Sequence, residues 1–257
     1  MSLIQINNRT LFYRTGKKEL NPEWPNLFWI HGAGGSHQNW LNQLVGNHGP
    51  VNVLALDLPG HGESEGPGEE TISGYADWVL AFLKECPGTK WILGGHSMGG
   101  AIAIECALKD PAAMDALILA GTGARLPVDL RFLKGLQEDP NTWIERVIQF
   151  AYAPEAPREL VSGGVALMKA APAGVVWGDF TACNGFDRSE TLKEIQKPVL
   201  IICGAKDILA PPAASLFLKE QIPGASYQSI PEAGHMAMLE KPELFDQAVE
   251  DFLNHLL

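Results

Sequence analysis

The stretch "GGHSMGG", residues 94–100, places one serine among four glycines directly after the apolar run "WIL". Gly95 and Gly99 stand two positions on either side of Ser97, which fits the pattern G-x-S-x-G. Small neighbours allow a sharp strand-to-helix bend that holds a serine hydroxyl outward as a nucleophile. The alternative interpretation is a plain turn, so the elements around Ser97 have to decide between the two.

Short apolar runs, each ending in a glycine-containing loop, recur at residues 26–32, 51–60, 89–97, 115–123, 198–207 and 225–235. Such runs are typical of strands buried on both faces of a parallel sheet. Helical periodicity fills the intervals at residues 71–86, 98–110, 211–222 and 242–257. Residues 3–16 instead alternate about Asn7 and Asn8, which predicts an antiparallel hairpin. The order predicts a doubly wound α/β fold with its ligand site beyond the carboxyl ends of the strands.

The interval between residues 126 and 195 interrupts this rhythm. It has no good strand pattern, and its helical patches cover residues 129–137, 141–152, 158–171 and 175–186. An interval of this length is too long for a loop. We therefore expect residues 1–125 and 196–257 to form the core domain and residues 126–195 to form an inserted helical lid.

Composition excludes several kinds of partner. The 257 residues carry 19 basic and 30 acidic side chains, a formal charge of -11, which disfavours nucleic acid and anionic membranes. The four cysteines show no CxxC spacing and fit a reducing compartment. No leader or membrane-spanning run is recognised. We expect a cytoplasmic monomer or homodimer whose partner is a small molecule.

A serine nucleophile needs a base and an acid. His235 follows the last predicted strand, and Asp207 ends the strand before it, so both share the sheet edge with Ser97. The position after residues 115–123 offers no alternative carboxylate. His96 is nearer in sequence but is better interpreted as a packing residue, because it points from the bend itself. The strand-end histidines His31, His37 and His61 are candidates for the pocket lining.

The stretch "HGAGG", residues 31–35, ends the first crossover strand with small residues that allow close approach to a ligand. We expect the backbone N–H groups of Ala33 and Met98 to form an oxyanion hole. A phosphate-binding loop is disfavoured because no lysine-serine ending follows. Metal chemistry is disfavoured as well, because neither HExxH nor a cysteine-histidine cluster with ligand spacing is present.

With these motifs in place, the chain resembles the α/β-hydrolase superfamily over essentially its full length. The stretches that carry the resemblance are "LFWIHGAGGSHQNW", "LALDLPGHGES", "GGHSMGGAIAIECAL", "PVLIICGAKDILAPP" and "IPEAGHMAMLEKPELF". The resemblance implies a mostly parallel eight-stranded sheet with a helical cap, serine-histidine-aspartate catalysis and no cofactor. Ser97 stands where haloalkane dehalogenases and epoxide hydrolases carry an aspartate, which disfavours their reactions.

Three functions remain open at this point. The first is a carboxylesterase, similar to pimeloyl-carrier-protein methyl ester esterases and monoacylglycerol lipases. The second is a hydrolase of thioesters, or of carbon–carbon bonds in vinylogous diketones, using the same triad. The third is a binding protein on the same fold with little turnover. We expect ester hydrolysis, because the predicted triad is complete.

Overall fold

The strands form one sheet in the order β1-β2-β4-β3-β5-β6-β7-β8. The computed structural model describes residues 2–16, 19–46, 48–86, 88 and 90–257. Strand β2 runs antiparallel to both of its neighbours, and the remaining pairs are parallel. The strands are β1 (Ser2–Ile6), β2 (Arg9–Thr15), β3 (Asn26–Ile30), β4 (Asn52–Leu56), β5 (Trp91–His96), β6 (Ala116–Ala120), β7 (Val199–Gly204) and β8 (Ser226–Ile230). The predicted α/β fold with a mostly parallel eight-stranded sheet is confirmed.

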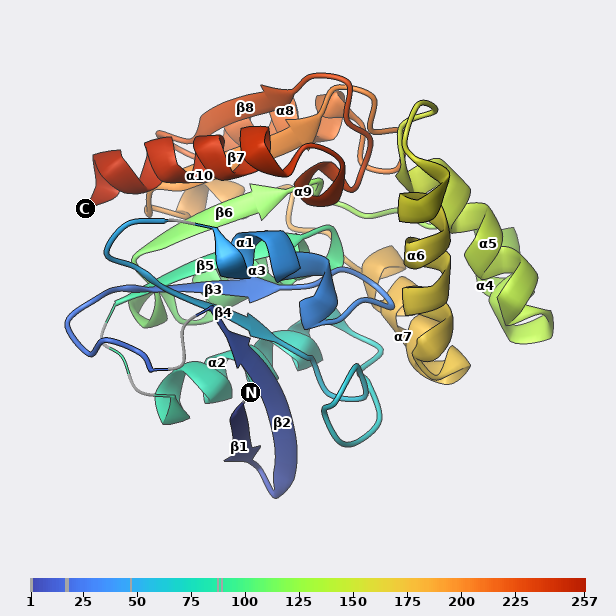
Figure 1. Cartoon of the computed structure of the whole chain (residues 1–257), viewed down its shortest axis with the longest axis horizontal. Helices are drawn as coiled ribbons and strands as arrows, with labels where there is room; N and C mark the ends of the chain where they lie inside the picture. Colours follow the sequence, from blue (N-terminus) through green and yellow to red (C-terminus); the bar gives the residue numbers. More distant parts are fainter. Residues whose placement is uncertain (1, 17–18, 47, 87, 89) are drawn as a thin grey trace.

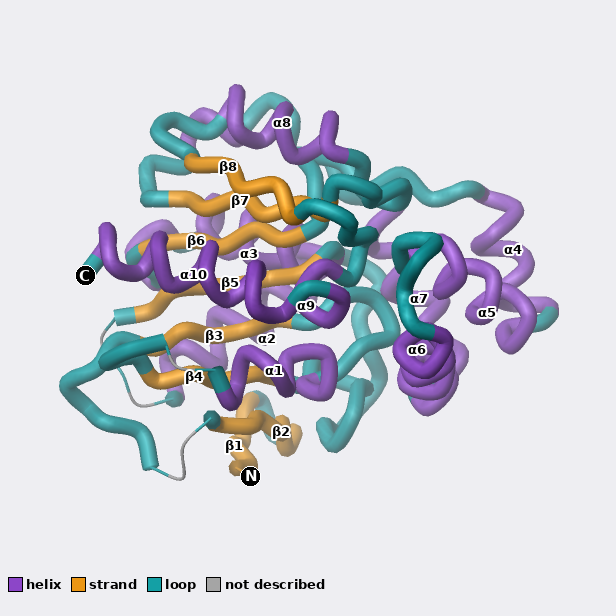
Figure 2. The backbone as a smooth tube through the Cα atoms, turned by 45° about the horizontal axis from the view of Figure 1, so that its top comes forward, coloured by secondary structure: helices purple, strands orange, loops and turns teal. Residues whose placement is uncertain are grey.

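Helices cover both faces of this sheet, and a further group lies beyond its end (Figures 1 and 2). The α-helices are α1 (Leu41–Val45), α2 (Ile72–Glu85), α3 (Met98–Lys109), α4 (Leu130–Glu138), α5 (Pro140–Ala151), α6 (Arg158–Ala170), α7 (Ala173–Asn184), α8 (Pro212–Gln221), α9 (Ala237–Glu240) and α10 (Pro242–Leu256). Short 3-10 helices are η1 (His37–Trp40), η2 (Pro111–Ala113) and η3 (Leu192–Glu194). The four helices predicted for the core all form, whereas the short α1 and α9 lack a recognisable pattern.

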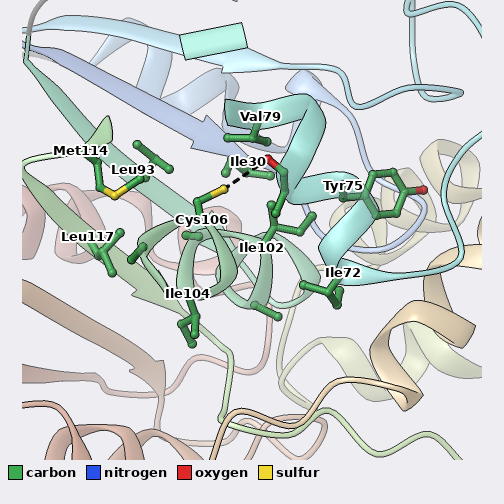
Figure 3. Packing of buried hydrophobic residues seen from close by; sticks show 14 of the residues in the cluster. Ile30, Ile72, Tyr75, Val79, Leu93, Ile102, Ile104, Cys106, Met114 and Leu117 are labelled. Atoms are coloured by element: carbon green, nitrogen blue, oxygen red, sulfur yellow. Dashed lines mark hydrogen bonds between the residues drawn. The ribbon is translucent and has the colours of Figure 1, made fainter. Parts of the chain in front are cut away.

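The central strands are buried on both sides, which explains their apolar runs. Successive residues of β3 point to opposite faces, so Phe28 joins a cluster with α2, α3 and α8, while Trp29 joins one with α1 and α10. Figure 3 shows the first cluster, where Tyr75 and Val79 of α2 and Ile102 of α3 pack over the sheet. The two clusters fix the sheet between its helical layers and so fix the edge where the strands end.

The hairpin at the start of the chain turns where the sequence predicts. Asn7 and Asn8 have φ angles of 49° and 64° between β1 and β2. Two successive left-handed residues match the twist of the flanking strands, and asparagine tolerates this conformation better than most residues. The pair therefore sets the register of β1 on β2.

Helices α4 to α7 fill the interval between β6 and β7. They lie together at the end of the sheet toward which the parallel strands point (Figure 1). All four predicted helical patches are present, and within the described residues of this interval the only β-pairing is an isolated bridge between Arg125 and Asp187. We call residues 126–195 the lid.

One part of the sequence prediction lies outside the described residues, namely Thr89 at the start of the predicted run 89–97. In the described ranges, no single helix has the length and apolar character needed to cross a bilayer. Helices α6 and α7 would pass that test as a pair, but they are bent by 101° relative to each other.

Candidate active site

Ser97 occupies the sharp bend between β5 and α3. Its backbone has φ 54° and ψ -115°, a strained conformation for a residue with a side chain. The glycines around it are required by close approach: a Cβ on Gly95 would lie 2.1 Å from the carbonyl oxygen of Gly99, and one on Gly99 would lie 2.2 Å from that of Ile30. The bend therefore has the geometry expected of a nucleophile elbow.

His235 and Asp207 meet at the same edge of the sheet, in the loops after β8 and β7. The Nδ1 of His235 donates to Oδ2 of Asp207 at 2.8 Å, and the amides of Leu209 and Ala210 donate to Oδ1, both at 2.9 Å. Burial alone would raise the pKa of Asp207, but its contact with His235 and the hydrogen bonds from the two amides outweigh burial and lower the pKa. Asp207 is thus a carboxylate that fixes the orientation of the imidazole.

His235 and Ser97 line one cavity of about 680 Å³. No hydrogen bond joins the two side chains in the described part of the chain, and Nε2 of His235 has no partner there either. His96 packs against His235 and donates from Nε2 to its carbonyl oxygen at 2.9 Å. Burial, with His235 beside it, lowers the pKa of His96 to about 3, so this ring is neutral and supports the loop.

The HGAGG loop lies against the elbow, because a Cβ on Gly32 would be 3.3 Å from that of Ser97. Two amides of this loop are already used, since Gly34 donates to Asp179 and Gly35 to the carbonyl of Gly32. The next amide, that of Ser36, donates to Asn39. The amide of Ala33 has no such partner among the described residues. Met98, as the first residue of α3, likewise has an N–H without an intrahelical acceptor. Two free amides thus border Ser97.

The cavity extends from the elbow into the lid. Most of the lid side chains that line it are apolar, and they include Phe132, Trp143, Phe150, Met168 and Phe180. The charged lid residues in its wall are Asp129, Arg131 and Arg146. Arg131 is held by Asp129, and Arg146 lies 4.6 Å over the Trp143 ring. The cavity is therefore mainly apolar, with its charges already in contact with neighbouring groups.

The prediction that His31, His37 and His61 line the pocket is wrong. All three are buried and absent from the cavity wall. His37 binds Asp57, and Nε2 of His31 accepts the amide of Leu58. Because these residues point inward behind the strand-end loops, they hold the loops and do not face a ligand.

The partner of His61 is Asp179 in α7 of the lid, a residue that the sequence analysis did not predict. It is completely buried and binds His61, Tyr75 and Gly34. The signal in the sequence is a single acid in the mainly apolar stretch "VVWGDFTAC". A charge in such a setting is stable only if it finds partners in the fold.

Metal-ligating side chains show no clustering at this edge. Across the described ranges, no group of three or more histidine, cysteine, aspartate or glutamate residues is arranged to hold a metal ion. The four cysteines are buried free thiols. At the sheet edge itself, the cavity is bordered by the Ser97 hydroxyl, the His235 imidazole and the backbone of the HGAGG loop.

Comparison with known proteins agrees with this geometry. A model of the alpha/beta hydrolase family matches residues 27–248. A solved structure of a thermophilic esterase superposes with a TM-score of 0.88 at 31% identity, covering 99% of this chain and 97% of that one. The chain belongs to the α/β-hydrolase family and is a hydrolase of the esterase-like type.

Three curated relatives are similar at lower identity. The dihydrolipoyllysine-residue acetyltransferase component of the acetoin cleaving system of Pseudomonas putida is 28% identical over 88% of this chain, which spans 63% of that protein. The putative carbamate hydrolase RutD of Agrobacterium fabrum is 27% identical, covering 90% of this chain and 94% of that protein. A pimeloyl-[acyl-carrier protein] methyl ester esterase of Nitrosospira multiformis is 26% identical, with 87% and 92% covered.

Proposed function

We propose that this protein is a serine hydrolase that cleaves a carboxylic ester of small or medium size through Ser97, His235 and Asp207. The observation that carries the proposal is the geometry at the cavity wall, where a serine on a strained bend and a histidine bound to a buried carboxylate border the same space. The esterase-like relatives support the same reaction class.

In the proposed mechanism, Nε2 of His235 takes the proton of Ser97 Oγ as the oxygen attacks the ester carbonyl carbon. The amides of Ala33 and Met98 donate to the oxyanion, and the N-terminus of α3 adds its positive end. The His235 imidazolium, stabilised by Asp207, then protonates the leaving alcohol. Water, deprotonated by the same imidazole, then attacks the acyl carbon. The bond to Ser97 Oγ breaks, the imidazolium returns its proton to this oxygen, and the acid is released.

The cavity suits an apolar acyl or alkyl group. Its volume of about 680 Å³ lies within the usual range for small-molecule sites, ~300–1,000 Å³. In the proposed reaction, the Ser97 hydroxyl and the His235 imidazole come within hydrogen-bond distance when substrate binds, because catalytic hydrogen bonds often tighten only in the complex. We propose that the lid, through its aromatic side chains, selects the substrate.

Labelling with a fluorophosphonate tests the assignment. We expect one adduct, mapped by mass spectrometry to Ser97 and lost in Ser97→Ala. An adduct on another residue, or equal labelling of the Ser97→Ala variant, would refute it. Rapid turnover of p-nitrophenyl butyrate with none of a dienoate diketone distinguishes ester hydrolysis from carbon–carbon bond hydrolysis.

A second candidate is carbamate hydrolysis, favoured by the similarity to the putative carbamate hydrolase. The same serine can attack a carbamate carbonyl, so labelling does not separate the two. A p-nitrophenyl carbamate assayed beside the ester does, because the preferred substrate has the higher kcat/KM. An ester preference supports the first proposal, and a carbamate preference overturns it.

A further inference from the structure

Asp179 of the lid is the centre of a buried hydrogen-bond cluster behind the HGAGG loop. Its Oδ2 accepts the backbone N–H of Gly34 at 2.7 Å and Nε2 of His61 at 2.8 Å, and its Oδ1 accepts the hydroxyl of Tyr75 at 2.5 Å. The Asp179 and His61 side chains are 0% exposed. The cluster therefore joins one lid helix to three separate segments of the core.

The contacts in this cluster fit a carboxylate beside an imidazolium. Burial alone would lower the pKa of His61, but the Asp179 charge and hydrogen bond outweigh it and raise the pKa, which favours the protonated ring. Nδ1 of His61 faces the carbonyl oxygen of Pro59 at 3.1 Å, so both ring nitrogens face acceptors. An imidazolium satisfies both contacts, and a buried ion pair results. Tyr75 lies at the edge of the core cluster with its hydroxyl directed away from the other side chains drawn (Figure 3).

The hydrogen bond from Gly34 to Asp179 matters because the Gly34 amide is next in the chain to that of Ala33. Gly34 has a φ of 61°, and its N–H belongs to the peptide unit that begins at Ala33. The preceding peptide unit, which joins Gly32 to Ala33, carries the Ala33 N–H, and the two units share the Cα atom of Ala33. A glycine-rich loop has several accessible conformations, so an acceptor that holds one unit restricts the direction of the other. Asp179 is the side chain that supplies this acceptor.

We propose that Asp179 is a positioning residue that holds the HGAGG loop so that the Ala33 amide faces the reacting carbonyl oxygen. The inference rests on the proposed function, since it assigns Ala33 to the oxyanion hole. It makes the lid part of the machinery for transition-state stabilisation, in addition to its place in the cavity wall. An oxyanion-hole donor must be held close to its required position, and losing one costs roughly 10²- to 10³-fold in kcat.

Three variants test the role of this carboxylate. Asp179→Ala removes the acceptor of Gly34. Asp179→Asn keeps an amide oxygen that can accept from Gly34, while its NH₂ faces the Tyr75 oxygen. Tyr75→Phe is the matched control, because it removes a hydrogen bond to Oδ1 and leaves the one between Oδ2 and Gly34.

We expect Asp179→Ala to lower kcat by about 10- to 100-fold with KM within about twofold of wild type, as a misplaced donor would. The affinity for a trifluoromethyl ketone, which forms a tetrahedral adduct with an oxyanion, should fall by the same factor. Asp179→Asn should recover most of the kcat, and Tyr75→Phe should stay within about twofold of wild type. Amide hydrogen exchange in residues 31–36 should be faster in Asp179→Ala alone.

Asp179→Ala leaves the buried His61 without its partner, which destabilises the fold. A second variant therefore tests the inference if the first does not fold. Combining Asp179→Leu, His61→Leu and Tyr75→Phe replaces every side chain of the cluster with an apolar one, which proteins tolerate better than one missing partner. The same loss of kcat is expected. Three results would overturn the inference. The first is an unchanged kcat in whichever of the two variants folds. The others are a change in KM in place of kcat, and an equal loss of kcat in Tyr75→Phe.

Fluorophosphonate labelling separates this inference from the proposed function. If wild-type protein forms no adduct at Ser97, the hydrolase assignment fails and the inference fails with it. If the adduct forms and the kinetics of the Asp179 variants remain those of wild type, only the inference fails.

Discussion

Among the histidine-aspartate pairs of the described residues, two have the same hydrogen-bond length but lie in different settings. His235 binds Asp207 and His61 binds Asp179, each at 2.8 Å. In the first pair, the second ring nitrogen has no hydrogen-bond partner among the described residues, and the ring borders the cavity. In the second pair, that nitrogen faces the carbonyl of Pro59, and nothing of the pair reaches the cavity.

A hydrogen bond to an aspartate is therefore not enough to make a histidine a catalytic base. A base must accept a proton during the reaction, so its second nitrogen has to be free and accessible. Burial alone would lower the pKa of His61, but the Asp179 charge and the Pro59 carbonyl outweigh it and raise the pKa. The protonated form of His61 is therefore favoured and fixes structure, whereas we propose that His235 cycles between its two forms.

The largest effect is expected from replacing the proposed base. His235→Ala should lower kcat/KM for p-nitrophenyl butyrate by roughly 10⁶-fold, because triad members act as a unit. Fluorophosphonate labelling of Ser97 should be lost as well. His255→Ala is the control, since His255 lies exposed on α10 and should leave both readouts unchanged. A loss of only tenfold in His235→Ala would break the comparison, because some other base would then act on Ser97.

The next effect concerns the acid of the same pair. Asp207→Asn keeps the shape of the side chain but removes the charge that stabilises the imidazolium, and it favours the wrong tautomer of His235. We expect kcat to fall by about 10⁴-fold with KM nearly unchanged. Steady-state kinetics of the purified variant measures this. A variant with near wild-type kcat would show that His235 is oriented by another group.

The first pair and Ser97 could be predicted from the sequence because each of the three residues follows a strand. Ser97, Asp207 and His235 each come after a short apolar run that predicts a buried parallel strand, and parallel strands end at one edge of the sheet. Local pattern and topology thus bring together residues that are far apart in the chain. The apolar runs, the Asn7–Asn8 turn and the helical periodicity of the lid were predictable for the same reason.

The second pair could not be predicted in this way. Asp179 is 118 residues from His61 and 145 from Gly34, and no strand order relates the lid helix to either. Which face of α7 turns toward the core depends on how the lid packs, and the sequence does not encode that packing in a periodic pattern. The same reason explains why His31 and His61 were wrongly expected to line the pocket: a strand-end position fixes where a residue lies but not which way its side chain points.

Replacing His61 separates structural from catalytic roles. His61→Leu leaves the Asp179 charge buried without its cationic partner, which should lower the free energy of unfolding by about 3–5 kcal/mol. Urea denaturation at pH 6 measures the loss. The folded variant should still be labelled at Ser97, unlike His235→Ala. A variant as stable as wild type would show that the ion pair contributes little and would remove the contrast between the two pairs.

The smallest effect is the pH dependence that His61 adds to stability. Its folded pKa is raised above the value of about 6.5 that it has when unfolded, so its contribution is complete below that pH and is lost as the pH rises through the folded value. The groups around His61 are Asp179, Tyr75, Asp57 and His31. Burial and the neighbouring His61 lower the pKa of His31 to about 4, so His31 stays neutral in this range. The free energy of unfolding of wild type should therefore decline above neutral pH more steeply than that of His61→Leu, by less than the loss caused by the substitution itself. Urea titrations of both proteins from pH 6 to pH 9 measure the two slopes, and parallel slopes would mean that His61 does not hold its proton through its contact with Asp179.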